Sequence, residues 1–384
     1  MHLFLTDDTL TRLEIFDDYE SLIWTERFNT WGDFELVVSS SPTTRRLFVK
    51  GRKLEIDRSR RMMVIETTAS KFDEDGQAIL EIKGRSLESI LLDRPALHPT
   101  QSKWEWNDTP TAVVTGMFNA ICRDGLVSSE DIIPYLNAGN IFPADTIDAP
   151  IDPIIVELEP TDLYTPISEI AEAYNFGFRL VKDPAAQKLY FNVYPGSDRT
   201  SVQEVYPAVI FSPELDSLPN IENFSSNMNL KNVAIVVSPV GRETVYAAGV
   251  DPSVAGFERK VLVVYADDIE DADPGVATSR MIQRGYEALI KHREEFVLDG
   301  EAREDGIYTY GVDYHLGDVV EMREPSGSAN RMRVTEQIFV SDSEGIRAYP
   351  TLSKDLYVSA GSWLSWNSQI TWAEACEDDY WANA

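Results

Sequence analysis

The sequence predicts an α+β fold that is mostly β, with two small β-barrel modules joined by α/β insertions. Three observations support this prediction. Short runs rich in Ile, Val, Phe and Leu fill residues 1–95, similar runs return in residues 216–355, and residues 96–215 between them carry two segments with helical spacing. Short strands at such spacing are typical of small barrels and sandwiches. A chain of 384 residues can bury two or three separate cores.

Residues 1–95 predict the first β-barrel module. Partial alternation of apolar and polar residues marks six candidate strands: 11–16, 21–28, 33–38, 52–58, 61–68 and 77–84. The stretch "DEDG" ends in Asp75 and Gly76, which tolerate positive φ and therefore favour a tight turn between the last two strands. Trp31 precedes Gly32 at another turn, so we interpret it as closing the barrel rather than as a ligand platform.

Residues 96–215 predict an α/β insertion. It contains three elements: helices near 109–123 and 166–175, and a hairpin at 177–194. The first helix has clear start signals, because Asp108 or Thr109 can serve as N-cap and Pro110 suits the first helical position. Gly125 would end it.

Residues 216–355 predict the second β-barrel module, which includes a long helix near 277–294. Seven runs of β-type composition surround that helix: 232–239, 242–249, 259–266, 294–301, 318–324, 331–340 and 346–352. Residues 356–384 form a Trp-rich C-terminal tail, here called the Trp-rich segment. Its four tryptophans are Trp363, Trp366, Trp372 and Trp381. They are too many for a merely solvated end, so we expect the segment to dock on a protein surface.

Composition excludes several classes of protein. The 64 acidic and 34 basic residues give a net charge of −30, which disfavours nucleic-acid binding by counterion release. This acidity could simply keep a large protein soluble, or it could line a wall along which DNA slides. No apolar run approaches the roughly 18 residues needed to span a bilayer, and "MHLFLTDDTL" does not resemble a signal peptide. Two cysteines cannot form a disulfide framework or a cysteine metal cluster.

The sequence carries no strong catalytic, metal-binding or cofactor signature. Its four histidines, His2, His98, His292 and His315, lack the spacing of metal ligands. We therefore expect no catalytic residue, no metal site and no cofactor.

Two stretches leave an enzymatic alternative open. In "WEWND", Glu105 and Asp108 beside two tryptophans could act as the paired carboxylates of a polysaccharide hydrolase. The alternative is that Asp108 caps the following helix while the tryptophans pack. In "DYHLGD", an acid–base cluster of Asp313, His315 and Asp318 competes with a simple turn into a strand. We favour the structural interpretation of both stretches.

The order of several motifs resembles one known family. "LIWTERFNTWGDFELVV", "GRKLEID" and "MMVIETTASKFDEDGQAILEIKGRSLESILLDR" are similar to the opening of the siphovirus Gp37-like phage tail proteins. "YPGSDRTS", "IFSPELDSLPNIENFSSNMNLKNVAIVVS" and "DYHLGDVVEMRE" agree with later landmarks of that family. These proteins are baseplate hub or minor tail proteins, similar to the N-terminal hub part of tail-associated lysins. The resemblance covers residues 10–352 and rests on turns and strands rather than on chemical sites.

The resemblance implies a structural, non-enzymatic role at the virion tail tip, after assembly in the host cytoplasm. It implies a phage tail hub-like homotrimer whose six barrels join the tail tube or distal tail ring to the tip and line the DNA exit channel. The implied partners are further copies of the chain, distal tail or tail-tube ring proteins, the tape measure protein, and tip, fibre or receptor-binding subunits. DNA would pass without specific binding. A tail-associated hydrolase and a glycan-binding tip protein remain the alternatives.

Five tryptophans are the candidate residues for interface or attachment: Trp31, Trp363, Trp366, Trp372 and Trp381. The irregular alternation around Trp31 fits a strand buried on both faces, with a neighbouring subunit outside. The Trp-rich segment is a candidate attachment point for another subunit, because aromatic side chains dominate interface energies. Its alternative is docking within the chain on the second β module.

Overall fold

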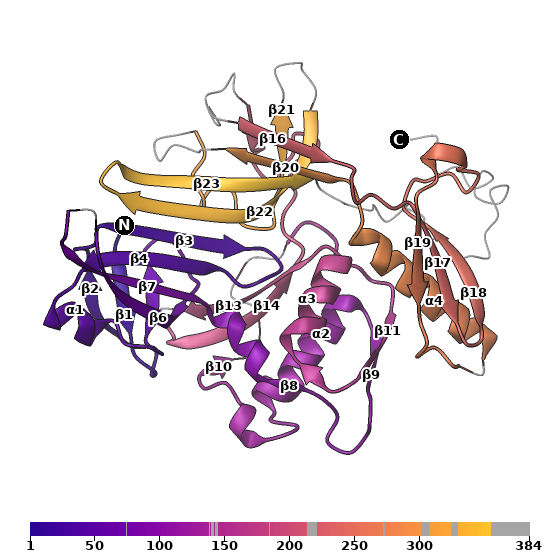
Figure 1. Ribbon diagram of the computed structural model, residues 1–384, viewed down its shortest axis with the longest axis horizontal. Helices are drawn as coiled ribbons and strands as arrows, with labels where there is room; N and C mark the ends of the chain where they lie inside the picture. Colours follow the sequence, from indigo (N-terminus) through magenta and orange to yellow (C-terminus); the bar gives the residue numbers. More distant parts are fainter. Residues whose placement is uncertain are drawn as a thin grey trace. The chain divides into compact units, whose positions relative to one another are not determined.

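The computed structural model describes residues 1–354 except 74, 138, 140, 141, 143, 144, 184, 213–220, 272, 301–306 and 324–328. The fold is mostly β, with 42% strand and 19% helix. Within the described residues, no helix is both long and apolar enough to cross a membrane. Figure 1 shows long, curved strands beside a mixed region of helices and short strands.

The chain divides into two compact units. Within the described residues, unit 1 comprises Met1–Ser225 and 296–354, and unit 2 comprises Ser226–Glu295. This division differs from the modules expected at 1–95, 96–215 and 216–355, because strands from both ends of the chain share unit 1. Each unit is described by itself below.

One large sheet forms the framework of unit 1. Its N-terminal strands are β1 (Leu3–Thr6), β2 (Arg12–Phe16), β3 (Ser21–Arg27), β4 (Asp33–Ser39), β5 (Lys53–Ile56), β6 (Met63–Phe72) and β7 (Ala78–Ser86). Its later strands are β15 (Ile210–Phe211), β16 (Ile221–Ser226), β20 (Glu295–Gly300), β21 (Val319–Arg323), β22 (Ala329–Asp342) and β23 (Gly345–Lys354). The order is β16-β20-β23-β22-β3-β4-β7-β6-β5-β1-β2, with β21 joined to β22 and β15 to β21.

Alternating side chains build the core of this sheet. In β4, Phe34, Leu36 and Val38 are buried while the residues between them are more exposed, as expected for a strand with one face on a core. Pairing of β3 with β22 sets Trp24 opposite Phe339, which brings residues more than 300 positions apart into one buried cluster. A short helix, α1 (Pro42–Leu47), is capped by Ser41 and follows β4.

Strands from both of the sets expected to form separate barrels therefore belong to one sheet, whereas the expected runs 232–239, 242–249 and 259–266 form a separate sheet. Figure 1 shows β22 and β23 running beside β3 and β4. Among the described residues the pairings form an open path from β16 to β2, and no closed barrel is found.

The α/β insertion is the part of the chain between β7 and β15. Its helical elements are η1 (Leu87–Asp93), α2 (Pro110–Phe118), the π-helical turn η2 (Asn119–Arg123), η3 (Ser129–Asp131) and α3 (Tyr164–Ala173). Its strands are β8 (Pro95–Ala96), β9 (Trp104–Asp108), β10 (Leu136–Asn137), β11 (Ile154–Leu158), β12 (Thr161–Asp162), β13 (Gly177–Asp183) and β14 (Lys188–Tyr194). Thr109 is the N-cap of α2, and its hydroxyl accepts a hydrogen bond from the Ala112 amide. The β13–β14 pair occupies the residues expected to form the hairpin.

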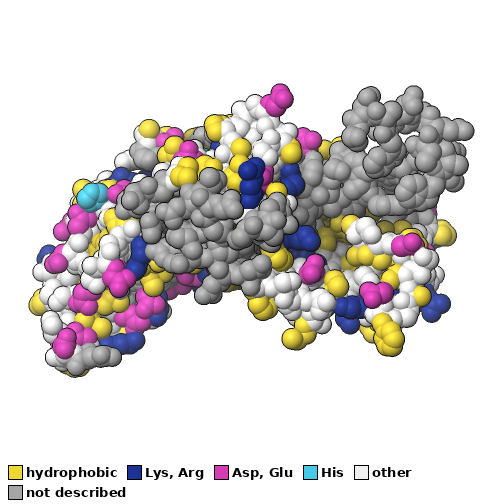
Figure 2. Space-filling model, turned by 90° about the horizontal axis from the view of Figure 1, so that it is seen from above, with side chains coloured by type: hydrophobic (Ala, Val, Ile, Leu, Met, Phe, Trp, Pro, Cys, Tyr) yellow, Lys and Arg dark blue, Asp and Glu magenta, His cyan; other side chains and the backbone are white. Residues whose placement is uncertain are grey.

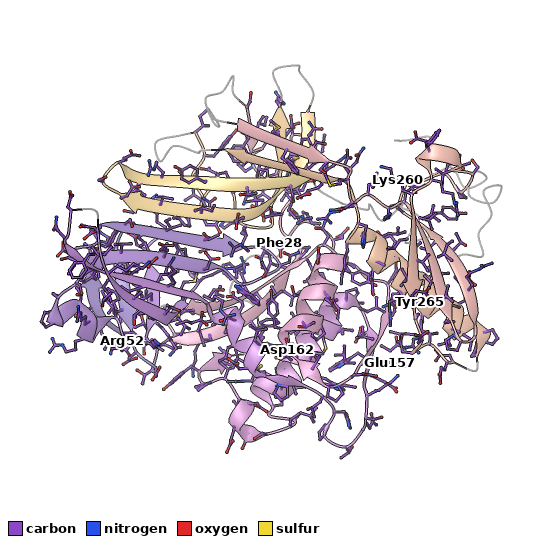
Figure 3. The ribbon with its side chains drawn as sticks, viewed as in Figure 1. Phe28, Arg52, Glu157, Asp162, Lys260 and Tyr265 are labelled. Atoms are coloured by element: carbon purple, nitrogen blue, oxygen red, sulfur yellow. The ribbon has the colours of Figure 1, made fainter. Side chains whose placement is uncertain are left out.

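Phe28 lies where the insertion meets the large sheet (Figure 3). Its ring packs edge-on against Tyr194, with centroids 5.4 Å apart, and the Arg333 guanidinium lies 5.1 Å from the ring centroid. A Cβ atom at Gly177 or at Gly317 would approach this ring to 2.5 Å. Both positions therefore require glycine for the two parts of unit 1 to pack this closely.

Unit 2 is a two-layer structure of one sheet and one helix. It contains β17 (Val233–Ser238), β18 (Gly241–Tyr246), η5 (Gly256–Glu258), β19 (Val261–Tyr265) and α4 (Pro274–Ile290). The strand order is β18-β17-β19, and β19 runs parallel to β17. Asp273 caps α4, which packs its Ala277, Met281 and Leu289 against the sheet. This helix corresponds to the one expected near 277–294.

Candidate functional site

Charged side chains are buried where the insertion meets the sheet of unit 1. Arg61 is 3% exposed and Glu88 is 1% exposed. Arg61 Nη2 donates to the Arg27 carbonyl at 2.8 Å, and its Nη1 lies 3.5 Å from Glu88 Oε1. The same carboxylate oxygen accepts the backbone N–H of Leu180 at 2.8 Å. The Arg61–Glu88 pair therefore connects three segments: the residues just before β6, the helix η1 and the strand β13.

Aromatic hydroxyls and a second arginine extend this cluster. Tyr310 donates to Glu26 at 2.9 Å, and Ser59 donates to the other oxygen of that carboxylate. The Arg179 guanidinium lies between two rings, 3.6 Å from the centroid of Phe142 and 3.9 Å from that of Tyr194. The arrangement is rich in fixed donors and acceptors, which hold neighbouring segments together.

Burial and neighbouring charges shift the pKa values of these groups in different directions. Burial would lower the pKa of Arg61, but Glu88, together with Tyr194, Glu26 and Tyr310, outweighs burial and raises that pKa above its usual value. Burial and the nearby Arg61 charge both lower the pKa of Arg179. Burial, reinforced by Glu26, raises the pKa of Tyr310 well above its usual value, so this phenol stays protonated and donates its hydrogen bond.

A second buried pair links the N-terminal strands to β13. Glu55 accepts from Lys182 at 2.6 Å, from Arg12 at 2.8 Å and from the hydroxyl of Thr6 at 2.6 Å. Burial would raise the pKa of Glu55, but the hydrogen bonds from Lys182, Thr6 and Arg12 together lower it. Glu55 therefore remains ionised, and both of its carboxylate oxygens accept hydrogen bonds.

The stretch "DYHLGD" forms a turn held by Asp318. One oxygen of Asp318 accepts the His315 backbone N–H at 2.9 Å and the Arg199 guanidinium at 2.6 Å, and the other accepts the Ser197 N–H at 2.9 Å. Gly317 has φ +91°, a conformation that suits glycine. The geometry favours the turn interpretation over an acid–base cluster, because Asp318 is buried and both of its oxygens already accept hydrogen bonds from the protein.

The stretch "WEWND" forms strand β9, paired with β11. Trp104 is buried, and a Cβ at Gly116 of α2 would meet the Trp106 ring at 2.5 Å, so both indoles pack inside the insertion. Asp108 accepts the backbone N–H of Thr109 at the start of α2. Glu105 is exposed, whereas Trp104 is buried and Trp106 is half-buried against α2, so the structure favours packing of the two indoles.

Trp31 is half-buried and faces the insertion. Its ring centroid lies 4.2 Å from that of Tyr164, and Arg85 lies 5.2 Å from the ring centroid. Trp24, by contrast, is fully buried in the sheet core. The structure thus gives Trp31 a packing role within unit 1, while its role between subunits stays a prediction. Trp363, Trp366, Trp372 and Trp381 lie outside the described residues.

Sequence reasoning missed the buried ionic clusters. A weak signal was available, because Arg61, Glu88 and Lys182 each sit inside or beside an apolar run. The sequence alone does not show which charged residues in such runs form buried ion pairs. Within the part of the chain that the structure describes, no group of three or more His, Cys, Asp or Glu residues could hold a metal ion.

Three solved structures of tail proteins have a fold similar to that of this chain. The 43 kDa tail protein of prophage MuSo2 from Shewanella oneidensis has a TM-score of 0.55 and 13% identity, with 92% of this chain and 97% of that chain covered. A tail protein from Neisseria meningitidis MC58 has a TM-score of 0.55 and 14% identity, covering 92% and 96%. Prophage tail protein gp18 from Listeria monocytogenes EGD-e has a TM-score of 0.51 and 12% identity, covering 92% and 95%.

The family is defined by sequence. Residues 2–352 match the model of the Siphovirus ReqiPepy6 Gp37-like protein family, and the chain belongs to that family. No curated protein sequence matches the chain. The resemblance noted from the motifs is thereby confirmed, and the family and its structural neighbours are structural tail proteins.

Proposed function

We propose that this protein is a homotrimeric hub at the distal end of a long phage tail. In this role it joins the tail tube or distal tail ring to the tip and borders the channel through which DNA leaves. The observation that carries the proposal is the family match over residues 2–352, supported by tail-protein folds that cover more than nine-tenths of the chain. The proposed partners are tail-tube or distal ring proteins, the tape measure protein and tip, fibre or receptor-binding subunits.

The charge distribution supports a passage for DNA. Figure 2 shows many Asp and Glu side chains, in magenta, on the part of unit 1 at the left of the view. A net charge of −30 would repel phosphates, so DNA would meet few attractive contacts. Three copies of a chain with two barrel-like modules would also give the sixfold arrangement that a hexameric tail ring requires. The proposal also includes three features that were expected from the sequence. These are the closure of two barrels in the assembled ring, the module boundaries at 1–95, 96–215 and 216–355, and a contact of Trp31 with a neighbouring subunit.

A symmetry-resolved cryo-electron microscopy map of the tail tip tests the proposal. We expect three copies around the tail axis, with acidic side chains facing the channel. A particle that lacks the protein, or that holds it away from the axis, would refute the hub role. Isolated protein can remain monomeric until its neighbours are present, so its mass in solution is a weaker test.

A further inference from the structure

The sheet of unit 2 has one face covered by a helix and one face without such a cover. α4 packs on the face presented by Ala234, Val236 and Val245. Residues paired across neighbouring strands share a face, so the register places nine side chains on the opposite face. They are Val233, Ile235 and Val237 of β17, Arg242, Thr244 and Tyr246 of β18, and Val261, Val263 and Tyr265 of β19. We call these nine residues the open face; Val233, at its edge, is buried, and the other eight are half-buried or exposed.

The open face is apolar and accessible along β19. Val263 is 51% exposed and Tyr265 is 72% exposed. Ile235 and Val237 of the neighbouring strand are half-buried and lie directly beside them in register. Single exposed apolar residues are ordinary, but a contiguous group across two strands marks a surface that other protein covers.

The charges of this surface are also distinctive. Arg242 is the only charged residue among the nine, although acidic residues outnumber basic ones by 64 to 34 in the chain. Arg259 and Lys260 immediately precede β19, and Figure 3 places Lys260 and Tyr265 at its two ends. An apolar surface with cations on it and at its margin suits an occupant that is itself apolar and acidic.

We propose that the Trp-rich segment, residues 356–384, docks on the open face. The segment has four tryptophans, two tyrosines, four acidic residues and no lysine or arginine, so it complements the face in both polarity and charge. Its 29 residues could span up to roughly 100 Å when extended, so reach does not limit docking. This inference takes up the alternative that the segment docks on the second β module, and it does not rest on the trimer or the hub.

The chemistry of the contact follows from the residue types. Indole rings bring large apolar areas and can stack on Tyr265, while their N–H groups remain free to face water. The acidic residues that follow Trp372, including Glu377 and Asp378, can pair with Arg242 or with Lys260 at the margin. Docking would thus cover Val263 and Tyr265, whose exposure is otherwise unfavourable.

Hydroxyl-radical footprinting of the full chain tests the proposal. We compare the natural sequence with a variant in which Trp363, Trp366, Trp372 and Trp381 are all changed to Ser. Tyr265 should label several-fold more slowly in the natural sequence. Phe257, a fully exposed residue in η5 outside the open face, should label equally in both and serves as the control. Equal labelling of Tyr265 in the two proteins would overturn the proposal.

Cross-linking through the native Cys376 identifies the occupant. Val263→Cys on the open face is compared with Ile282→Cys, which places an accessible thiol on α4 instead. The only other cysteine, Cys122, does not compete because burial raises its pKa to about 12. A short bismaleimide should link position 263 to Cys376 in preference to position 282.

The size of the cross-linked product shows whether the docked segment comes from the same chain or from another copy of the protein. A monomer-sized product means that the segment docks on its own chain, and a dimer-sized product means that it is exchanged between copies; both support the proposal. Equal linking at positions 263 and 282 refutes it. A tail map without threefold symmetry would overturn the hub function yet leave these results unchanged, so the two failures are distinguishable.

Discussion

Removing Glu88 should strongly destabilise unit 1, because it leaves the Arg61 charge buried without its ionic partner. Both side chains are almost completely inaccessible, and Glu88 also accepts the Leu180 amide. Breaking a buried pair by removing one partner costs about 3–5 kcal/mol. We therefore expect Glu88→Ala to lower the stability of unit 1 by about that amount. A paired change, Arg61→Met with Glu88→Leu, should cost much less, because no isolated charge remains.

The measurement is thermal unfolding of the full chain. A loss of 1 kcal/mol shifts the midpoint by about 2–4 °C in a domain of 150–250 residues, so Glu88→Ala should lower it by roughly 6–20 °C. Glu35→Gln is the matched control, since Glu35 forms an exposed pair with Lys83 at 2.8 Å and should change stability by less than about 1 kcal/mol. A Glu88→Ala shift no larger than that of the control would refute the reasoning. So would a double variant as unstable as the single one.

Four further outcomes are expected. Gly285→Ala should destabilise unit 2 by about 1–3 kcal/mol, because its Cβ would lie 2.7 Å from Val245 and 2.8 Å from Val236; unchanged hydrogen exchange in α4 would contradict this. Glu55 has a lowered pKa in the folded state, so its contribution is present above about pH 4.5 and is lost as pH falls through the folded pKa; Glu55→Gln should therefore flatten the acid limb of a stability–pH curve. Glu105→Gln should leave zymograms on purified cell walls unchanged, and clearing that depends on Glu105 would establish the hydrolase instead. Trp31→Ala should lower trimer or particle yield, and normal tails from that variant would count against its interface role.

Local elements could be predicted because their signals are local. Thr109 and Pro110 mark the start of α2 through capping chemistry that needs no distant partner. The alternation around "DPAAQ" likewise identifies β13 and β14, since a hairpin is made by neighbouring residues. The strand β4 shows the same regular alternation of buried and more exposed positions.

The long-range pairing could not be predicted from these patterns. β3 pairs with β22, with Trp24 opposite Phe339, yet several other strands have equally suitable apolar alternation. The sequence therefore suggested two separate β modules, whereas the structure places strands from both in one sheet. The role of Glu88 could not be predicted either, because its hydrogen-bond partner, the Leu180 amide, comes from the distant strand β13.

Three buried carboxylates hold segments of unit 1 together. Glu55 joins β5 to β13, Glu88 joins η1 to β13, and Asp318 fixes the turn before β21 against Arg199. A catalytic acid needs a free oxygen and a pKa near the working pH, but Glu55 is fully engaged and its pKa is lowered. Buried pairs of this kind add little net stability, but they penalise any arrangement that separates them. In the proposed hub role such a penalty is useful, since the insertion and the sheet cannot shift apart without exposing isolated charges.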